Sequence, residues 1–146
     1  MALIDLALKR ALIAHTGQLD KAGKPYILHP LRLMARFNDP IDQAVAVLHD
    51  VLEDSDTTAG DLRLDGIPEE VIEAVELLSR GKGVSYNDFI ERIRPHPLAR
   101  KVKMADLEDN LNILRLPNLG DGDQRRITKY YRAWHLLAMT ENRELP

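Results

Sequence analysis

Apolar residues recur at steps of three and four along most of the chain, which is the spacing of one face of an α-helix. The first such stretch starts at Leu3 and ends near Gly17, a residue type that commonly follows the last turn of a helix. Prolines and capping residues separate the later stretches. The expected helices cover residues 3–16, 27–37, 40–53, 68–81, 85–94, 97–116 and 123–140, with a short helix or turn at 61–64. Since no stretch alternates as a strand does, the pattern predicts an all-α fold of about seven helices.

The composition agrees with a helical protein. Hydrophobic residues make up 45% of the chain and aromatic ones only 5%, so the core must consist mainly of Leu, Ile, Val and Ala. That mixture favours helices over strands. The 146 residues are the usual size of one domain, and we find no linker or repeat in them. We therefore expect residues 1–146 to form a single compact helical bundle.

The net charge and the absence of cysteine narrow the range of possible functions. The chain has no cysteine, which excludes disulfides, thiolate metal sites and a cysteine nucleophile. A formal net charge of -3 gives no general electrostatic reason to bind nucleic acid, and no apolar run is long enough to cross a bilayer. Residues 1–12 carry Asp5 and Lys9 at helical spacing and do not resemble a signal peptide. We expect a cytoplasmic protein that binds neither nucleic acid nor membrane.

One expected helix combines apolar and ionisable residues in an unusual way. Residues 44–48 are apolar around nearly the whole helix, which predicts burial on most sides. His49 and Asp50 follow directly, and Glu53 and Asp54 come one turn later. Burying an unpaired charge costs several kcal/mol, which a metal ion or an opposite charge would offset. Glu53 and Asp54 taken alone are equally well explained as surface carboxylates at a helix end.

Two other segments carry polar residues of the same chemical kind. Asp106 and Asn110 share a helical face, and Lys103 precedes Asp106 by three positions. His29 lies between apolar residues at an expected helix start. Each segment alone has an ordinary interpretation, with Asp106 as a surface residue and His29 as a core histidine.

Taken together, these segments supply two imidazoles and two carboxylates, a set that suits one divalent ion such as Mn, Fe, Co, Ni or Zn. The candidate ligands are His29, His49, Asp50 and Asp106. A metal with open coordination positions lowers the pKa of a bound water and yields a hydroxide nucleophile near neutral pH. Glu53, one turn after His49, is placed to orient that water or to act as a general base.

The same segments resemble the HD-domain hydrolases, and most closely the hydrolase domain of the Rel/SpoT alarmone enzymes and their small stand-alone relatives. The matching segments are Tyr-Ile-Leu-His-Pro at 26–30, Leu-His-Asp-Val-Leu-Glu-Asp at 48–54, Thr57 with Thr58, and Lys-Met-Ala-Asp at 103–106 with Asn110. The resemblance covers residues 10–116, most of the chain. Because the family fold is a compact helical bundle, the resemblance implies a single HD-domain bundle.

The resemblance also implies a role for the matching residues. The two histidines and two aspartates would bind one metal, usually manganese in this family, and Glu53 and Asp54 would assist hydrolysis. The family removes pyrophosphate from the 3′ position of guanosine tetra- and pentaphosphate, so the implied partner is a small phosphorylated nucleotide. The substrate contacts expected from the resemblance or from charge are Lys21, Tyr26, Lys103, Asn110 and Arg115.

Two departures from the family concern residues that read the nucleotide. The family usually has Arg-Lys before Gly-Glu-Pro-Tyr, where this chain has Asp20-Lys21, so a carboxylate replaces an arginine that contacts the base. After the metal-binding aspartate the family usually reads Arg-Leu-His-Asn-Met-Arg-Thr, where residues 107–113 here read Leu-Glu-Asp-Asn-Leu-Asn-Ile. Ile113 therefore replaces a threonine that helps bind the nucleotide. The catalytic residues are retained, whereas the base-reading residues differ.

Three classes of function fit the sequence. The leading one is an enzyme, a 3′-pyrophosphohydrolase of guanosine tetraphosphate or, alternatively, an HD-type nucleotide monophosphatase of other specificity. The second is a non-catalytic module that senses a nucleotide, and the third is a structural helical protein without a tightly bound metal. A homodimer is compatible with each. The basic residues of the last expected helix fit a solvated face or phosphate contact at the rim of the site; they are Arg125, Arg126, Lys129 and Arg132.

Overall fold

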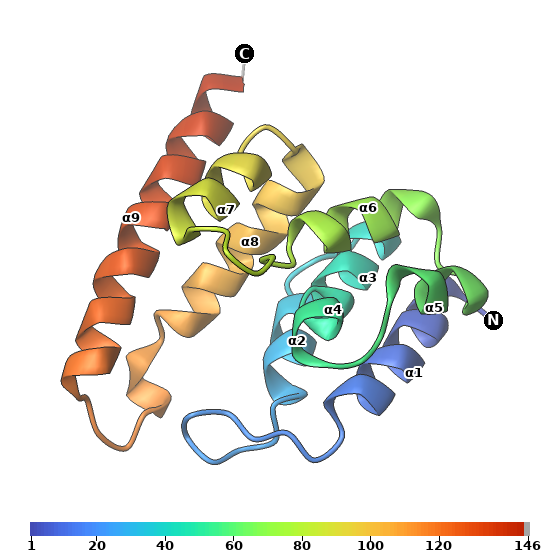
Figure 1. Ribbon diagram of the computed structural model, residues 1–146, viewed down its shortest axis with the longest axis horizontal. Coiled ribbons are helices and arrows are strands. Elements are labelled where there is room, and N and C mark those ends of the chain that lie inside the picture. The colour runs from blue at the N-terminus through green and yellow to red at the C-terminus, as the bar shows by residue number, and fades with distance from the viewer. Residues whose placement is uncertain (145–146) are drawn as a thin grey trace.

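A computed structural model describes the chain from residue 1 to residue 144, with side chains to residue 142. The described chain is all-helical, which confirms the predicted fold class (Figure 1). The α-helices are α1 (Leu3–His15), α2 (Leu28–Met34), α3 (Pro40–Leu48), α4 (Val51–Asp54), α5 (Ala59–Leu64), α6 (Glu69–Leu77), α7 (Tyr86–Ile93), α8 (Pro97–Asn110) and α9 (Asp121–Glu144). A 3-10 helix, η1 (Ile113–Arg115), lies between α8 and α9.

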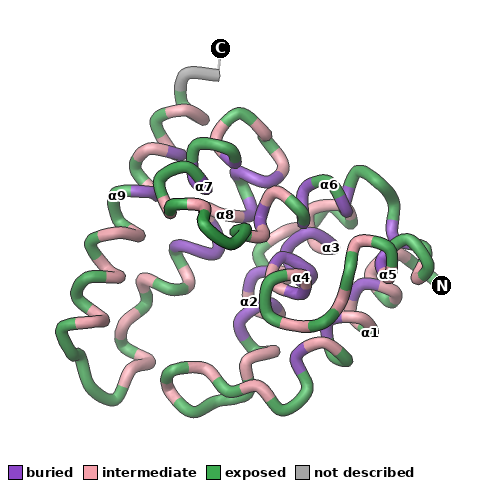
Figure 2. Tube along the Cα trace, viewed as in Figure 1, coloured by how far each residue is buried: buried purple, intermediate pink, exposed green. Residues whose placement is uncertain are grey.

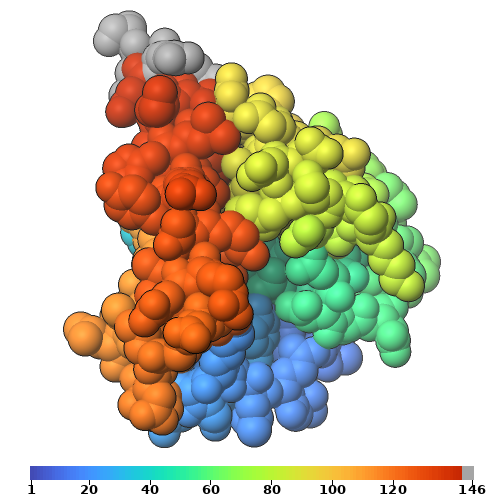
Figure 3. All heavy atoms as spheres, turned by 60° about the vertical axis from the view of Figure 1, so that its left-hand side comes forward, coloured from blue at the N-terminus to red at the C-terminus, as the bar shows by residue number. Residues whose placement is uncertain are grey.

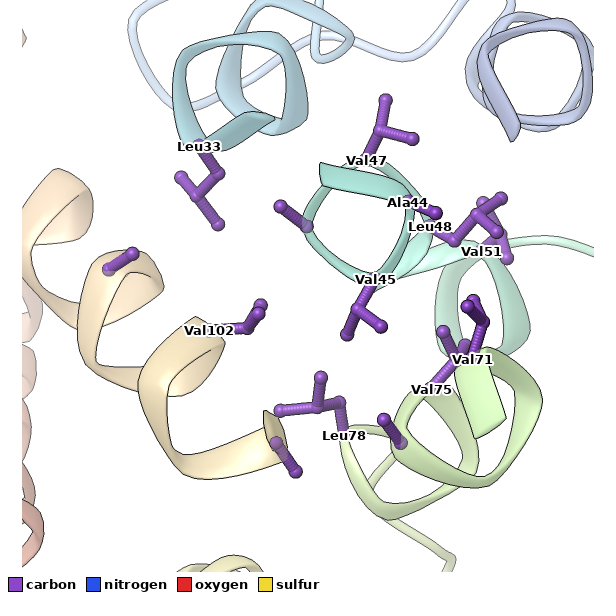
Figure 4. Packing of buried hydrophobic residues seen from close by; sticks show 14 of the residues in the cluster. Leu33, Ala44, Val45, Val47, Leu48, Val51, Val71, Val75, Leu78 and Val102 are labelled. Atoms are coloured by element: carbon purple, nitrogen blue, oxygen red, sulfur yellow. The ribbon is translucent and has the colours of Figure 1, made fainter. Parts of the chain in front are cut away.

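Helix α3 forms the centre of the core (Figure 2). Residues 44–48 are fully buried, as their apolar run predicts, and α3 contacts α1, α2, α6 and α8. Figure 4 shows its side chains among Leu33 of α2, Val71 and Val75 of α6 and Val102 of α8. Full burial of each Leu or Val side chain stabilises the folded chain by about 1.5–3 kcal/mol relative to leaving that side chain exposed. This packing fixes the end of α3, where the His-Asp pair lies.

Helix α8 joins the core to the C-terminal helices. It contacts α2, α3 and α6 on one side and α7 and α9 on the other (Figure 1). Ala133 and Leu137 of α9 are buried in this packing. The packing of α8 thereby holds Asp106 against the end of α3.

None of the described helices, including the long α9, is both long and apolar enough to cross a membrane.

The expected helix over 40–53 is wrong in one respect, because it is interrupted at the His-Asp pair. Helix α3 ends at Leu48 and α4 begins at Val51. In a continuous helix the Asp50 N–H would reach the carbonyl of Ala46. That carbonyl instead accepts a hydrogen bond from Nδ1 of His49 at 2.7 Å. The side chain of the histidine thus replaces a backbone donor and ends the helix.

The expected helix over 97–116 is also too long. Helix α8 ends at Asn110, and the chain continues as η1. The Asp109 carbonyl, which the Ile113 N–H would reach in a continuous helix, accepts instead from the backbone N–H of Asn112 at 3.2 Å and from Nη2 of Arg115 at 2.6 Å. The described residues therefore contain nine α-helices where the sequence predicts about seven, because one helix is split and the short segment at 61–64 is helical.

Candidate metal centre and the adjoining cavity

The four candidate ligands come together from three parts of the fold. His29 lies on α2, His49 and Asp50 occupy the break between α3 and α4, and Asp106 lies on α8. Nε2 of His29 is 2.8 Å from Oδ1 of Asp106 and 4.0 Å from Oδ2 of Asp50. Nε2 of His49 is 2.9 Å from the same Asp50 oxygen and 3.4 Å from the same Asp106 oxygen. Each of the two histidine nitrogens therefore faces one oxygen of Asp50 and one of Asp106.

The His49 ring is oriented with one nitrogen toward these oxygens. Its Nδ1 faces the Ala46 carbonyl, which can only accept, so Nδ1 keeps its proton and Nε2 is the nitrogen that can give up a proton to bind a metal. Nε2 is buried and has no aligned hydrogen-bond partner among the described residues, although Asp50 lies close by. A buried polar nitrogen without an aligned partner is costly unless it has a ligand to bind. The orientation of His49 fits a metal ligand.

The charges of the cluster also fit a cation. Burial disfavours the protonated form of both rings, but Asp50 and Asp106 outweigh this effect and raise the pKa of His49 well above its usual value. Hydrogen bonds to Asp106 and Asp109 likewise outweigh burial and raise the pKa of His29. His29, His49 and Asp50 offer ligand atoms within 4.8 Å of one another. These residues can hold one divalent metal ion, whose positive charge would replace that of the ring protons.

Three of the expected substrate contacts bind the ligand carboxylates. Lys103 donates to Oδ2 of Asp106 at 2.8 Å, and Asn110 donates to Oδ1 of Asp106 at 3.0 Å. The hydroxyl of Tyr26 donates to Oδ2 of Asp50. Burial would raise the pKa of Asp106, but Lys103 reverses the effect and holds that pKa well below its usual value. These residues therefore keep the carboxylates ionised and in place.

The two expected catalytic carboxylates have different surroundings. Glu53 is exposed, and its Oε1 accepts from the backbone N–H of Arg80 at 2.6 Å. Asp54 also reaches solvent, but partial burial of its carboxyl group and the charges of Asp50 and Glu53 raise its pKa to about 6. A carboxyl group that titrates near neutral pH is suited to proton transfer. Of the two, Asp54 has the environment of a general acid or base.

A cavity of about 270 Å³ adjoins the ligands. Its wall consists of the α1–α2 loop, the end of α8, η1 and the start of α9, and includes His29. Four of the five expected substrate contacts line it, namely Lys21, Tyr26, Asn110 and Arg115. In Figure 3 the start of α9 (orange) lies next to the segment that connects α1 and α2 (blue) on this face of the molecule. The cavity therefore connects one metal-ligand candidate with residues suited to a phosphorylated molecule.

Two charged residues here are not among the candidates from the sequence. Arg32 lines the cavity, as Arg126 does, and Asp109 bonds to the far side of the His29 ring. Arg32 follows His29 by three positions, and Asp109 follows Asp106 by three. This helical spacing could have indicated that Arg32 and Asp109 lie on the same faces as the ligands.

Both departures from the family pattern lie in the cavity wall. Asp20 and Ile113 line the cavity. Oδ1 of Asp20 accepts from the backbone N–H groups of Ala22 and Lys24, each at 2.9 Å. Asp20 therefore holds the turn of the α1–α2 loop, where the family usually has an arginine that contacts the base.

The basic residues of α9 have two different environments. Arg125 and Arg132 are exposed, as expected for a solvated face. Arg126 lines the cavity, and Nζ of Lys129 lies 4.5 Å from the ring centre of Tyr86. Both are partly buried, and the place of Arg126 in the cavity wall favours the second interpretation, phosphate contact at the rim of the site.

Comparison with known proteins indicates one group of enzymes. A guanosine-3′,5′-bis(diphosphate) 3′-pyrophosphohydrolase of Vibrio cholerae is 33% identical over 115 residues, which are 73% of this chain and 16% of that protein. A protein of the same name from Aquifex aeolicus is 31% identical over 123 residues, 76% of this chain and 18% of that protein. A solved structure of a metazoan ortholog of SpoT, described as hydrolysing ppGpp, has a TM-score of 0.77 and 24% identity, and covers 96% of this chain and 85% of that chain. No model of a known protein family matches the chain.

The chain is a relative of the Rel/SpoT-type hydrolases. This confirms the resemblance seen in the sequence, and the metazoan structure shows that the fold is shared. The chain spans less than a fifth of the length of the two curated Rel/SpoT-type relatives, at 16% and 18%.

Proposed function

We propose that the chain is a metal-dependent hydrolase that removes pyrophosphate from the 3′ position of a guanosine polyphosphate such as guanosine tetraphosphate. The observation that carries this proposal is the connection between the two-histidine, two-aspartate cluster and the cavity. The curated relatives named for this reaction support it. We propose Mn²⁺ as the metal, with Fe, Co, Ni or Zn as alternatives.

The proposed chemistry assigns a task to each part of the site. The two histidines and two aspartates would hold one metal ion, which when bound supplies a water of lowered pKa and neutralises phosphate charge. Asp54 would accept a proton from the attacking water and return it to the leaving group, and Glu53 would orient that water. Lys21 and Arg115 would stabilise phosphate oxygens from the cavity wall. Asn110 bonds Asp106 and lines the cavity, so it would align the nucleotide with the metal centre.

The altered cavity wall favours a second candidate, an HD-type nucleotide monophosphatase of other specificity. Asp20 and Ile113 replace the arginine and the threonine that read the nucleotide in the family, so a different base or sugar is a reasonable alternative. A non-catalytic sensing module is the third candidate. Its weakness is that such a module would tolerate the loss of Glu53 and Asp54, both of which the chain retains.

A product-resolved assay with the full chain and Mn²⁺ tests the proposal. The substrates are guanosine tetraphosphate, nucleoside mono-, di- and triphosphates and dinucleotide phosphates. We expect pyrophosphate from guanosine tetraphosphate, and none from a His49→Ala variant. Phosphate from another nucleotide, with guanosine tetraphosphate untouched, would favour the monophosphatase. Bound Mn²⁺ and bound nucleotide without turnover would favour the sensing module.

We also propose a cytoplasmic protein whose partner is the small nucleotide itself. The absence of nucleic-acid binding and a homodimer compatible with the site both remain predictions. Light scattering of the purified chain and a DNA- and RNA-binding assay at physiological salt test them.

A further inference from the structure

The carboxylate of Asp109 lies behind the proposed metal centre. Its Oδ2 is 2.6 Å from Nδ1 of His29, the ring nitrogen opposite the Nε2 that faces Asp106. The side chain of Asp109 is only 10% exposed. The contact therefore joins α8 to α2 directly beneath a metal-ligand candidate.

Two arginines hold this carboxylate in place. Arg32 donates to both oxygens of Asp109, at 2.9 and 3.0 Å. Arg115 donates to Oδ2 at 3.2 Å and to the backbone carbonyl of Asp109 at 2.6 Å. A two-pronged guanidinium contact fixes the plane of a carboxylate as well as its position. The two arginines thus fix the orientation of the Asp109 carboxylate beside the His29 ring.

The contact determines which His29 nitrogen keeps its proton when a metal binds. A carboxylate bound by two guanidinium groups only accepts hydrogen bonds, so Nδ1 of His29 must be the donor. Nε2, which lies 2.8 Å from Oδ1 of Asp106, is then the nitrogen that gives up its proton to bind a metal. A flip of the ring would break the bond to Asp109. The arrangement is the one in which a carboxylate orients a histidine for metal binding.

We propose that Asp109 is a positioning residue that fixes the tautomer and orientation of His29 for metal binding. The proposal rests on the proposed function only in taking the cluster as a metal centre. The family usually has histidine at this position, so the resemblance does not supply this role. Partners of this kind typically contribute 10–100-fold to metal affinity.

Calorimetric titration of the metal-free full chain with Mn²⁺ tests the proposal without any need for turnover. We expect Asp109→Asn to raise the Kd for Mn²⁺ about 10–100-fold, because a neutral amide is a weaker acceptor and no longer fixes the tautomer. The matched control is Glu108→Gln, which removes the same charge one residue earlier. Glu108 pairs with Arg36 at 2.9 Å, outside the centre, so its Kd should stay within about twofold of the parent value.

A second variant separates positioning from simple support of the fold. Arg32→Gln removes the ion pair between Arg32 and Asp109 but leaves the Asp109 carboxylate beside His29, still held by Arg115. If the cluster only joined helices, Arg32→Gln and Asp109→Asn would weaken Mn²⁺ binding equally. We expect both to lower the Tm, while only Asp109→Asn strongly weakens Mn²⁺ binding. An equal loss of affinity in the two variants would overturn the proposal.

The remaining outcomes are also decisive. A folded Asp109→Asn variant that binds Mn²⁺ as the parent does would overturn this inference alone. If Asp109→Asn does not fold, Asp109→Glu replaces it, since the extra methylene displaces the carboxylate from Nδ1 but keeps its charge. The same loss of affinity is expected, and an unchanged Kd would again contradict the proposal. A parent chain that binds no Mn²⁺ would overturn the proposed metal centre itself.

Discussion

At the scale of single residues, the site consists of buried charges that compensate one another. The side chains of Lys103 and Asp106 are 12% and 7% exposed, and they form an ion pair at 2.8 Å. Removing one partner of a buried pair leaves the other charge without compensation, which costs about 3–5 kcal/mol. Asp106 is therefore needed for stability as well as for the proposed metal binding.

Asp106→Ala is expected to abolish Mn²⁺ binding and turnover and to lower the free energy of unfolding of the metal-free chain by about 3 kcal/mol. Urea unfolding and metal analysis measure the two effects. Adding Lys103→Met removes the stranded charge, so the double variant should regain most of its stability but no metal. Full metal content and activity in Asp106→Ala would show that the ligand assignment is wrong.

Asp54→Asn is expected to keep the parent Kd for Mn²⁺ and to lower kcat by about 10²–10⁴-fold, because the amide cannot transfer the proton. Steady-state kinetics and calorimetry measure the two quantities. Asp56→Asn is the matched control, since Asp56 is an exposed aspartate two positions away and should leave kcat unchanged. A loss of metal in Asp54→Asn would instead indicate that Asp54 helps to bind the ion.

At the scale of helices, the difference between what the sequence predicts and what it does not has a physical cause. Apolar spacing is a local property, so most helices and the buried run at 44–48 could be predicted. The ends of α3 and α8 could not, because apolar spacing does not show where a side-chain donor, here His49 or Arg115, occupies a backbone carbonyl. Asp109 was missed for a similar reason, since spacing indicates a shared face but not which helix lies opposite.

The contact of Glu53 with Arg80 joins α4 to the loop that follows α6. Glu53→Ala is expected to keep Mn²⁺, to lower turnover and to speed amide hydrogen exchange in residues 79–84, because that loop loses an acceptor. Hydrogen exchange followed by mass spectrometry measures the loop directly. Glu76→Ala, an exposed change on α6, should leave the exchange unaltered. Unchanged exchange in Glu53→Ala would mean that the contact does not restrain the loop.

At the scale of the whole molecule, the proposed metal centre joins helices that are far apart in the sequence. Its candidate ligands come from α2, from the α3–α4 break and from α8. Helix α8 also packs against α7 and α9 (Figure 1). That all of these helices belong to one domain over residues 1–146 remains a prediction. An ion bound at this junction would bind the folded chain but not the unfolded one, since only folding brings the ligands together.

Metal binding should therefore raise the stability of the whole chain. With free Mn²⁺ at 100 times its Kd, linkage gives about 2.7 kcal/mol of added stability, which corresponds to a rise in Tm of roughly 5–10 °C for a chain of this size. Differential scanning calorimetry with Mn²⁺ and then with excess chelator measures the rise and its reversal. The Asp106→Ala variant should show neither, because it lacks a ligand. A purely structural helical protein would show no difference between the two conditions in the parent chain, so this experiment separates that class from both metal-binding classes before any substrate is known.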